Sequence, residues 1–183
     1  DLYLIHSPYG GRNIETYKTL LEYVKMGKIK SVGVSNYGVQ HIETLVKECK
    51  KNSWPLPVVN QIELHPWLQQ KDIKKCCNKY GIHIESYSAL TKGQKLKSVM
   101  KDKSHFLHKM ADKYGKSIAQ IILKWNIQDG NIVLVKSGNK GRIKENYGLF
   151  GWNISNDDMN KIYKLNKGYH CTWDPTTNNI NDF

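Results

Sequence analysis

Residues 31–64 read SVGVSNYGVQHIETLVKECKKNSWPLPVVNQIEL and contain the pattern on which the fold prediction rests. Two runs, residues 31–35 and 58–64, are apolar on successive positions, which is typical of parallel strands covered on both faces. Between them, apolar residues recur at the spacing of one helix face: Val39, Ile42, Leu45, Val46 and Cys49. A strand, a helix and a second strand in this order predict a βαβ unit and therefore a parallel sheet.

The same alternation continues on both sides of this unit. Further strands are predicted at residues 2–5, 83–89 and 132–136. Further helices are predicted at about residues 14–26, 69–80, 104–114, 117–127, 141–150 and 155–165, with Gly27 and Gly81 as ends and Ser155 as an N-terminal cap. The lysine-rich stretch 92–103 is predicted to be a loop and the tail from His170 to be irregular. No linker or repeat interrupts the pattern, so we expect one domain over residues 1–183.

Composition sets limits on the class of protein. The chain has 183 residues, and 39% are hydrophobic, which is enough to form a core. No apolar run approaches the length of a membrane span, so we expect no membrane partner. The 28 Lys and Arg against 16 Asp and Glu give a net charge of +12. The lysines are scattered and no nucleic-acid motif accompanies them. We therefore expect most of the positive charge to lie on solvated helix faces, and nucleic-acid binding stays an alternative.

Cysteines and short motifs narrow the chemistry further. The four cysteines form no Cys-x-x-Cys pair and have no histidine at zinc-ligand spacing, so we expect no metal site and a reducing, cytoplasmic setting. No Gly-x-Gly-x-x-Gly follows a predicted strand, which argues against a dinucleotide-binding doubly wound sheet. Walker A, Gly-x-Ser-x-Gly and His-Glu-x-x-His motifs are also absent from the sequence.

Polar residues follow the five predicted strands at their carboxyl ends, where parallel α/β folds gather functional groups. They are His6, Ser35, Asn36, Asn60, Gln61, Glu63, His65, Tyr87, Ser88, Lys136, Ser137, Asn139 and Arg142. Ser, Asn and Gln side chains suit a carboxamide, and a tyrosine ring suits stacking. Lys136 and Arg142 suit a phosphate. The pattern therefore predicts a ligand site shared across one end of the sheet.

Five blocks carry a resemblance to a known family: DLYLIHSP, GKIKSVGVSNY, VVNQIELHPWLQQ, ESYSAL and VLVKSGNKGRIKEN. In this order and spacing, from residue 1 to about 174, they resemble the signature blocks of the aldo-keto reductases. The resemblance implies an α/β fold of the (β/α)8 TIM-barrel type, here incomplete with about five βα units. It also implies an NADPH-dependent oxidoreductase that reduces an aldehyde or ketone, with a small-molecule carbonyl compound as substrate.

The resemblance carries roles to individual residues. His6 matches the family's active-site histidine, which orients and polarises the carbonyl. Ser35, Asn36 and Gln61 match nicotinamide carboxamide contacts, and Tyr87 matches the stacking tyrosine. The remaining cofactor-binding matches are Ser88 and Leu90 on the pyrophosphate side, Lys136, Ser137 and Arg142 at the adenosine 2′-phosphate, and Glu145 and Asn146 at the adenine.

The chain departs from the family pattern in three ways. Ser7 stands where Trp is frequent, and Gly138 stands where an aromatic residue is common. The family's proton-donating Tyr, the Lys that lowers its pKa and a supporting Asp lie upstream of the strand that carries the histidine. None of the eleven tyrosines here lies in a matching motif. We therefore expect a C-terminal portion of such a reductase, with impaired catalysis by this chain alone.

Two further expectations concern alternatives and partners. A non-catalytic binding or scaffold protein that keeps the cofactor contacts is the alternative from a different class. A complete (β/α)8 barrel typically needs about 250 residues, so five units are too few to close. We expect a monomeric full-length parent, and self-association of this chain through the exposed edges of residues 2–5 and 132–136.

Overall fold

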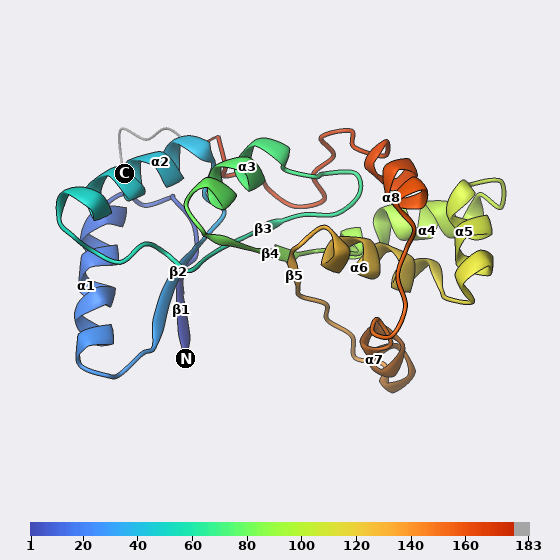
Figure 1. Ribbon diagram of the computed structural model, residues 1–183, viewed down its shortest axis with the longest axis horizontal. Coiled ribbons are helices and arrows are strands. Elements are labelled where there is room, and N and C mark those ends of the chain that lie inside the picture. Colours follow the sequence, from blue (N-terminus) through green and yellow to red (C-terminus); the bar gives the residue numbers. More distant parts are fainter. Residues whose placement is uncertain (178–183) are drawn as a thin grey trace. The chain divides into compact units, whose positions relative to one another are not determined.

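The computed structural model describes residues 1–177 and contains five strands and eight α-helices within them (Figure 1). The strands are β1 (Leu2–Ile5), β2 (Ser31–Ser35), β3 (Val59–Glu63), β4 (His83–Tyr87) and β5 (Ile132–Val133). The helices are α1 (Asn13–Lys25), α2 (Val39–Lys51), α3 (Lys71–Lys79), α4 (Gln94–Lys101), α5 (Phe106–Tyr114), α6 (Ile118–Gln128), α7 (Lys140–Tyr147) and α8 (Asn156–Tyr163), with a short 3-10 turn at Thr91–Gly93.

The strands follow one another in the sheet in chain order, β1-β2-β3-β4-β5. β1 is parallel to β2, with Leu4 opposite Gly33, and β2 is parallel to β3, with Ser35 opposite Gln61. Helices separate these strands along the chain, so the predicted βαβ pattern and parallel α/β class are confirmed. The register matters for function because it sets Ser35 and Gln61 side by side at the carboxyl ends of their strands.

Close packing divides the chain into two compact units. The first contains Asp1–Ile62, Gln70–Glu85 and the tail from Trp173, and the second contains Glu63–Gln69 and Ser86–Thr172. β3 and β4 each run from the first unit into the second. The prediction of one domain over residues 1–183 stays a prediction, and residues 178–183 of the predicted irregular tail lie outside the described residues.

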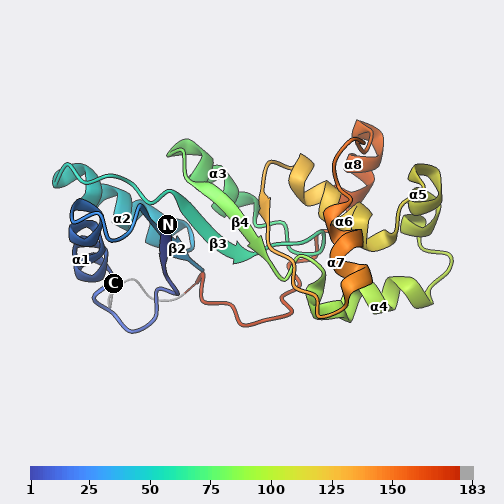
Figure 2. The same cartoon turned by 90° about the horizontal axis from the view of Figure 1, so that it is seen from below.

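In the first unit, α1 packs against β1 and β2, and α2 packs against α3 (Figures 1 and 2). Its core includes Val34, Ile42, Leu45 and Ile62, all without exposed surface. Two buried tyrosines bond across this core. The Tyr37 hydroxyl donates to Asn13 Oδ1 at 2.7 Å, and the Tyr17 hydroxyl donates to the Pro55 carbonyl at 3.0 Å. Burial raises the pKa of both tyrosines, so they remain neutral donors.

In the second unit, α6 is the central helix, and α4, α5 and α7 contact it. Its residues Ile121, Ile122 and Trp125, which the sequence places on one helix face, are fully buried, and so is Leu123. A polar chain fixes this helix to the sheet. Asn126 Nδ2 donates to Ser86 Oγ at 2.7 Å, and Ser86 Oγ donates to the Leu64 carbonyl at 2.7 Å.

Several boundaries differ from prediction. Residues 92–103 were predicted to be a loop, which is wrong, because α4 occupies most of this stretch. Val99 is its buried anchor, and the surrounding lysines hide its helical pattern in the sequence. β5 covers only residues 132–133 of the predicted 132–136, and α7 ends at Tyr147, before Phe150. Gly27 at φ 70° follows α1, and Ser155 caps α8 by accepting from the Asp158 N–H, both as predicted.

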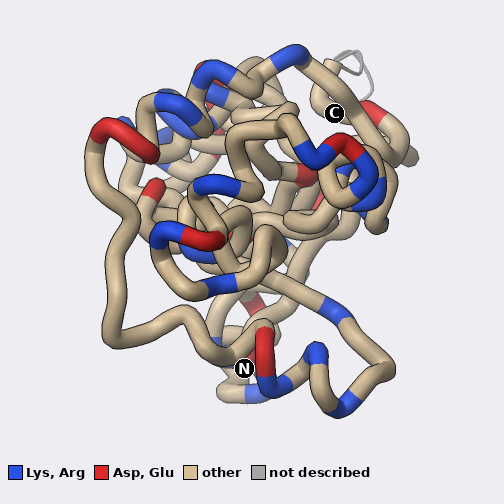
Figure 3. The backbone as a smooth tube through the Cα atoms, turned by 90° about the vertical axis from the view of Figure 1, so that its right-hand side faces the viewer, with Lys and Arg blue, Asp and Glu red and all other residues tan. Residues whose placement is uncertain are grey.

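The charged residues are distributed along the whole described chain (Figure 3). Lys and Arg are interspersed with Asp and Glu, and they do not gather on one element. No described helix is long and apolar enough to cross a membrane. All four cysteines are free thiols, and Cys49, Cys76 and Cys77 are buried.

Candidate functional site

In the first unit, hydrogen bonds join the four residues that the resemblance assigns to the reacting end of the site. Ser35 Oγ and the Asn36 N–H both donate to the Gln61 carbonyl at 2.8 Å. Asn36 Nδ2 donates to Ser35 Oγ at 3.1 Å and to the His6 carbonyl at 2.9 Å. The ends of β1, β2 and β3 are thereby tied together, and His6, Ser35, Asn36 and Gln61 form one polar group.

An acidic side chain that the sequence did not single out belongs to this group. Gln61 Nε2 donates to Glu85 Oε2 at 2.6 Å. Gln61 lies on β3 and Glu85 on β4, and both side chains are half-buried. Nothing local in the sequence distinguishes Glu85 from an ordinary strand residue, because its importance depends on the neighbouring strand.

His6 is exposed at the end of β1, beside two aromatic rings. Its ring centroid lies 6.2 Å from that of Trp173, and Tyr9 stacks on Trp173 at 5.1 Å with an angle of 17° between the planes. Trp173 belongs to the irregular tail, and 43% of its surface is exposed. The three rings form an open aromatic wall next to the histidine.

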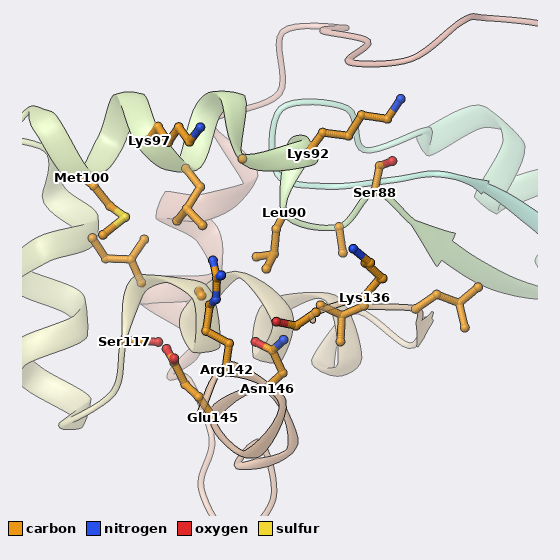
Figure 4. Close-up of a pocket in the computed structure, with 18 of the residues that line it drawn as sticks. Ser88, Leu90, Lys92, Lys97, Met100, Ser117, Lys136, Arg142, Glu145 and Asn146 are labelled. Carbon is orange, nitrogen blue, oxygen red and sulfur yellow. The ribbon is translucent and has the colours of Figure 1, made fainter. Parts of the chain in front are cut away.

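In the second unit, a cavity of about 950 Å³ lies between the end of β4, α4 and α7 (Figure 4). All eight predicted site residues of this unit line it: Tyr87, Ser88, Leu90, Lys136, Ser137, Arg142, Glu145 and Asn146. They come from three separate stretches of chain, so only folding brings them together. Figure 4 shows the Arg142 guanidinium pointing into this cavity, with Glu145 and Asn146 beside it on α7.

The cavity wall is strongly cationic. Lys136 and Arg142 are joined there by Lys92 and Lys97, whereas Glu145 is the one acidic residue among the described lining residues. Lys92 and Lys97 are exposed, as expected of surface lysines, and the 3-10 turn and α4 also carry them to the cavity wall. Asn139 caps the N-terminus of α7 by accepting from the Arg142 N–H at 3.0 Å. The positive end of this helix adds to the attraction for an anion.

The loop before α7 is short and open. Ser137 Oγ accepts from the Asn139 N–H at 3.1 Å, so this hydroxyl shapes the loop as well as lining the cavity. No atom lies within 4 Å of where a Gly138 Cβ would be. The position therefore leaves the space that an aromatic residue would fill.

A buried carboxylate lies in the same unit. Glu63 accepts from His65 Nε2 at 3.0 Å, from the Cys171 N–H at 2.7 Å, and from the N–H and hydroxyl of Thr172. Burial raises the pKa of Glu63, but these donors outweigh burial and lower it to about 2. Glu63 therefore fastens the tail to the end of β3.

The same cluster has the composition of a metal site. Ligand atoms of Glu63, His65 and Cys171 lie within 4.8 Å of one another. Burial and the nearby Glu63 carboxylate raise the pKa of the Cys171 thiol to about 12, which disfavours the thiolate that metals bind. Because the Glu63 oxygens already accept four protein hydrogen bonds, the geometry is that of a structural clamp.

Comparison with known proteins identifies the family. The sequence model described as "Aldo/keto reductase family" matches residues 1–167. An uncharacterized oxidoreductase of Schizosaccharomyces pombe is 43% identical over 96% of this chain and 60% of its own length. Glyoxal reductase of Bacillus subtilis is 41% identical over 91% of this chain and 57% of its own length. This chain belongs to the aldo-keto reductase family.

The solved structures give the same result for the fold. A mutant of Gox0644 in complex with NADPH superposes with a TM-score of 0.86 at 38% identity, covering 98% of this chain and 64% of that one. The fold is accordingly the α/β fold of the aldo-keto reductase barrels, with five strands in the described part. The chain spans about 60% of the length of the curated relatives that it matches.

Proposed function

We propose that this chain binds NADPH and supplies the cofactor-binding part of a reductase that converts an aldehyde or ketone to an alcohol. The observation that carries this proposal is the shared cavity of the second unit. Eight residues selected from the sequence by resemblance line one cavity, and two further cationic side chains, Lys92 and Lys97, join them.

The residues fit the adenosine end of the cofactor. Lys136 and Arg142 bear positive charge near the N-terminus of α7. This charge suits a 2′-phosphate and favours NADPH over NADH. Glu145 and Asn146 on the same helix offer an acceptor and an amide for the adenine. Ser88 and Leu90 line the opposite part of the cavity, toward the pyrophosphate.

The first unit fits the nicotinamide end. Ser35, Asn36 and Gln61 form a preorganised set of donors and acceptors for a carboxamide, since their own hydrogen bonds fix their backbone. For Tyr87 we propose the stacking role that the resemblance implies. NADPH supplies the hydride when it is bound. His6 orients the carbonyl oxygen by a hydrogen bond, and the rings of Tyr9 and Trp173 exclude water on one side of it.

A small dicarbonyl or simple aldehyde is the substrate class that we propose. The relative from Bacillus subtilis is named glyoxal reductase, and the aromatic wall beside His6 leaves an open approach for a small carbonyl compound. The 183 residues hold no tyrosine in the family's proton-donor motif, so we propose that this chain alone turns over slowly. A general acid typically contributes roughly 10²–10⁴-fold to such a rate.

Titration with NADPH, followed by quenching of tryptophan fluorescence, tests the proposal. We expect Arg142→Ala to weaken NADPH binding by roughly tenfold or more and NADH binding far less, because a charged hydrogen bond to phosphate is worth about 1.5–3 kcal/mol. Arg12→Ala is the matched control, since Arg12 pairs with Glu15 on the surface of α1. No quenching by millimolar NADPH contradicts the proposal. Normal NADPH binding with slow or no carbonyl reduction agrees with the impaired catalysis that we propose for this chain alone.

We also propose a reducing, cytoplasmic location. Support comes from the four free cysteines, three of them buried in a chain that uses none for a disulfide. Thiol labelling of the native protein from its source cells tests this, with full labelling after unfolding as the expected result.

A further inference from the structure

The orientation of the Gln61 side-chain amide follows from its neighbour. A side-chain amide has a donor end and an acceptor end, whereas a carboxylate only accepts. Gln61 contacts Glu85 Oε2 at 2.6 Å, so its nitrogen must face Glu85 and its oxygen must face away. The Gln61 backbone is fixed independently, because its carbonyl accepts from Ser35 Oγ and from the Asn36 N–H. The contact with Glu85 therefore sets which end of the Gln61 amide faces the neighbouring strand.

We propose that Glu85 is a positioning and specificity-determining residue of this site. By holding the Gln61 nitrogen, it leaves Oε1 to accept from an N–H donor of the bound ligand. A nicotinamide carboxamide has such a donor, and the carboxylate of a nicotinic acid dinucleotide has none. The pair therefore selects the amide form of the cofactor against its acid form. This inference rests on the proposed binding of NADPH.

Two physical effects act in the same direction. An acid-form ligand leaves Gln61 Oε1 facing an acceptor, and an acceptor left without a donor weakens binding. The negative charge of Glu85, one hydrogen bond from the binding amide, also repels a second carboxylate. Both Gln61 and Glu85 are half-buried, so the site is shielded enough for these effects to matter and open enough to admit a ligand.

Substituting Glu85 by glutamine separates this role from simple packing. In Glu85→Gln the neighbouring side chain is itself an amide, so Gln61 is able to bond to it in either orientation. The flipped Gln61 then presents its nitrogen to the ligand and can donate a hydrogen bond to a carboxylate. If the role of Glu85 is purely structural, the substitution weakens the binding of both ligands equally or leaves both unchanged. The ratio of the two dissociation constants then stays the same.

The experiment measures the dissociation constants of NADP⁺ and of its nicotinic acid analogue by calorimetry on the intact chain. We expect the wild type to prefer NADP⁺ by roughly tenfold or more, and Glu85→Gln to reduce this preference to roughly threefold or less, mainly through tighter binding of the acid analogue. Glu22→Gln, on the exposed face of α1, is the control and keeps the wild-type ratio. Glu85→Ala is a second variant, which removes the acceptor that orients the Gln61 amide. If Glu85→Gln does not fold, the same two dissociation constants are measured for Glu85→Ala.

The outcomes distinguish the two proposals. If the wild type binds neither dinucleotide, the proposed function fails and this inference fails with it. If the wild type binds NADP⁺ selectively and both folded Glu85 variants keep the full preference, cofactor binding stands and the role of Glu85 is overturned. A wild type that binds both ligands equally also overturns it.

Discussion

Asn36 shows how one residue type meets two requirements at the end of β2. Its backbone has φ 63°, in the left-handed region where asparagine is among the few side chains tolerated at modest cost. The bend turns its side chain so that Nδ2 reaches both the His6 carbonyl and Ser35 Oγ. Asn36 thus fixes both the end of β2 and the group of residues proposed to bind the carboxamide.

Glu63 acts at the residue scale on stability, and its effect depends on pH. Its folded pKa of about 2 lies below the ordinary value of 4.5. The ionised carboxylate therefore stabilises the folded chain above pH 4.5, and this contribution is lost as the pH falls toward 2. We expect Glu63→Gln to lower the free energy of unfolding at pH 7 by up to roughly 3 kcal/mol. Urea unfolding at several pH values measures this.

The control for this prediction is Glu15→Gln, because Glu15 is exposed and pairs only with Arg12. The control should keep the acid dependence of the wild type. Glu63→Gln should lose part of the stability change between roughly pH 4.5 and 2, since it lacks the titrating group. An unchanged acid profile in Glu63→Gln would show that the clamp on Cys171 and Thr172 contributes little.

At the scale of elements, Gly33 on β2 lies in close contact with residues of both neighbouring strands, β1 and β3. A Cβ at this position would lie 2.5 Å from Val59 Cγ1, 2.7 Å from Leu4 Cδ2 and 2.9 Å from the Val59 carbonyl oxygen. The last contact is with backbone, which cannot rotate away. Glycine at this position therefore permits the strand spacing that sets Ser35 opposite Gln61.

We expect Gly33→Ala to destabilise the fold by about 1–3 kcal/mol, the usual cost of overpacking a core. Thermal unfolding measures it, and NADPH affinity should fall as well because the register of β2 and β3 carries the polar group. Gly138→Ala is the matched control, because no atom lies within 4 Å of the added methyl group. Equal melting temperatures for the two variants would contradict this packing argument.

At the scale of the whole molecule, the chain covers about 60% of the length of its curated relatives. The sheet order puts β1 and β5 at its two ends among the described residues. β1 pairs with β2, and the large side chains Leu2 and Tyr3 on it are 42% and 54% exposed. Such an edge is a template for a further strand.

We therefore expect this chain to self-associate through β1 as its concentration rises. Tyr3→Lys should suppress the association, because a charged residue on an edge strand opposes pairing. Light scattering coupled to size-exclusion chromatography over a range of concentrations measures the mass. Tyr23→Lys, on the exposed face of α1, should associate like the wild type. A monomeric wild type at every concentration would refute the prediction.

The sequence by itself determined the order of strands and helices, the parallel sheet and the family. Periodicity, caps and signature blocks are local, so they can be read without knowing what packs against them. It also selected the eight residues that line the cavity of the second unit, though not the cavity itself. The pattern failed at α4, where three lysines are interspersed with three apolar residues and the single buried Val99 leaves little periodicity.

Only the tertiary structure decided which distant residues meet. Glu63 and Thr172 bond across 109 positions, and Gln61 and Glu85 bond across 24. Likewise, α4 carries Lys97 to a cavity whose other cations come from elsewhere in the chain. No local pattern encodes these contacts, because each one depends on how neighbouring strands and helices pack. The chemistry of single residues was therefore readable from the sequence, and their partners were fixed by the fold.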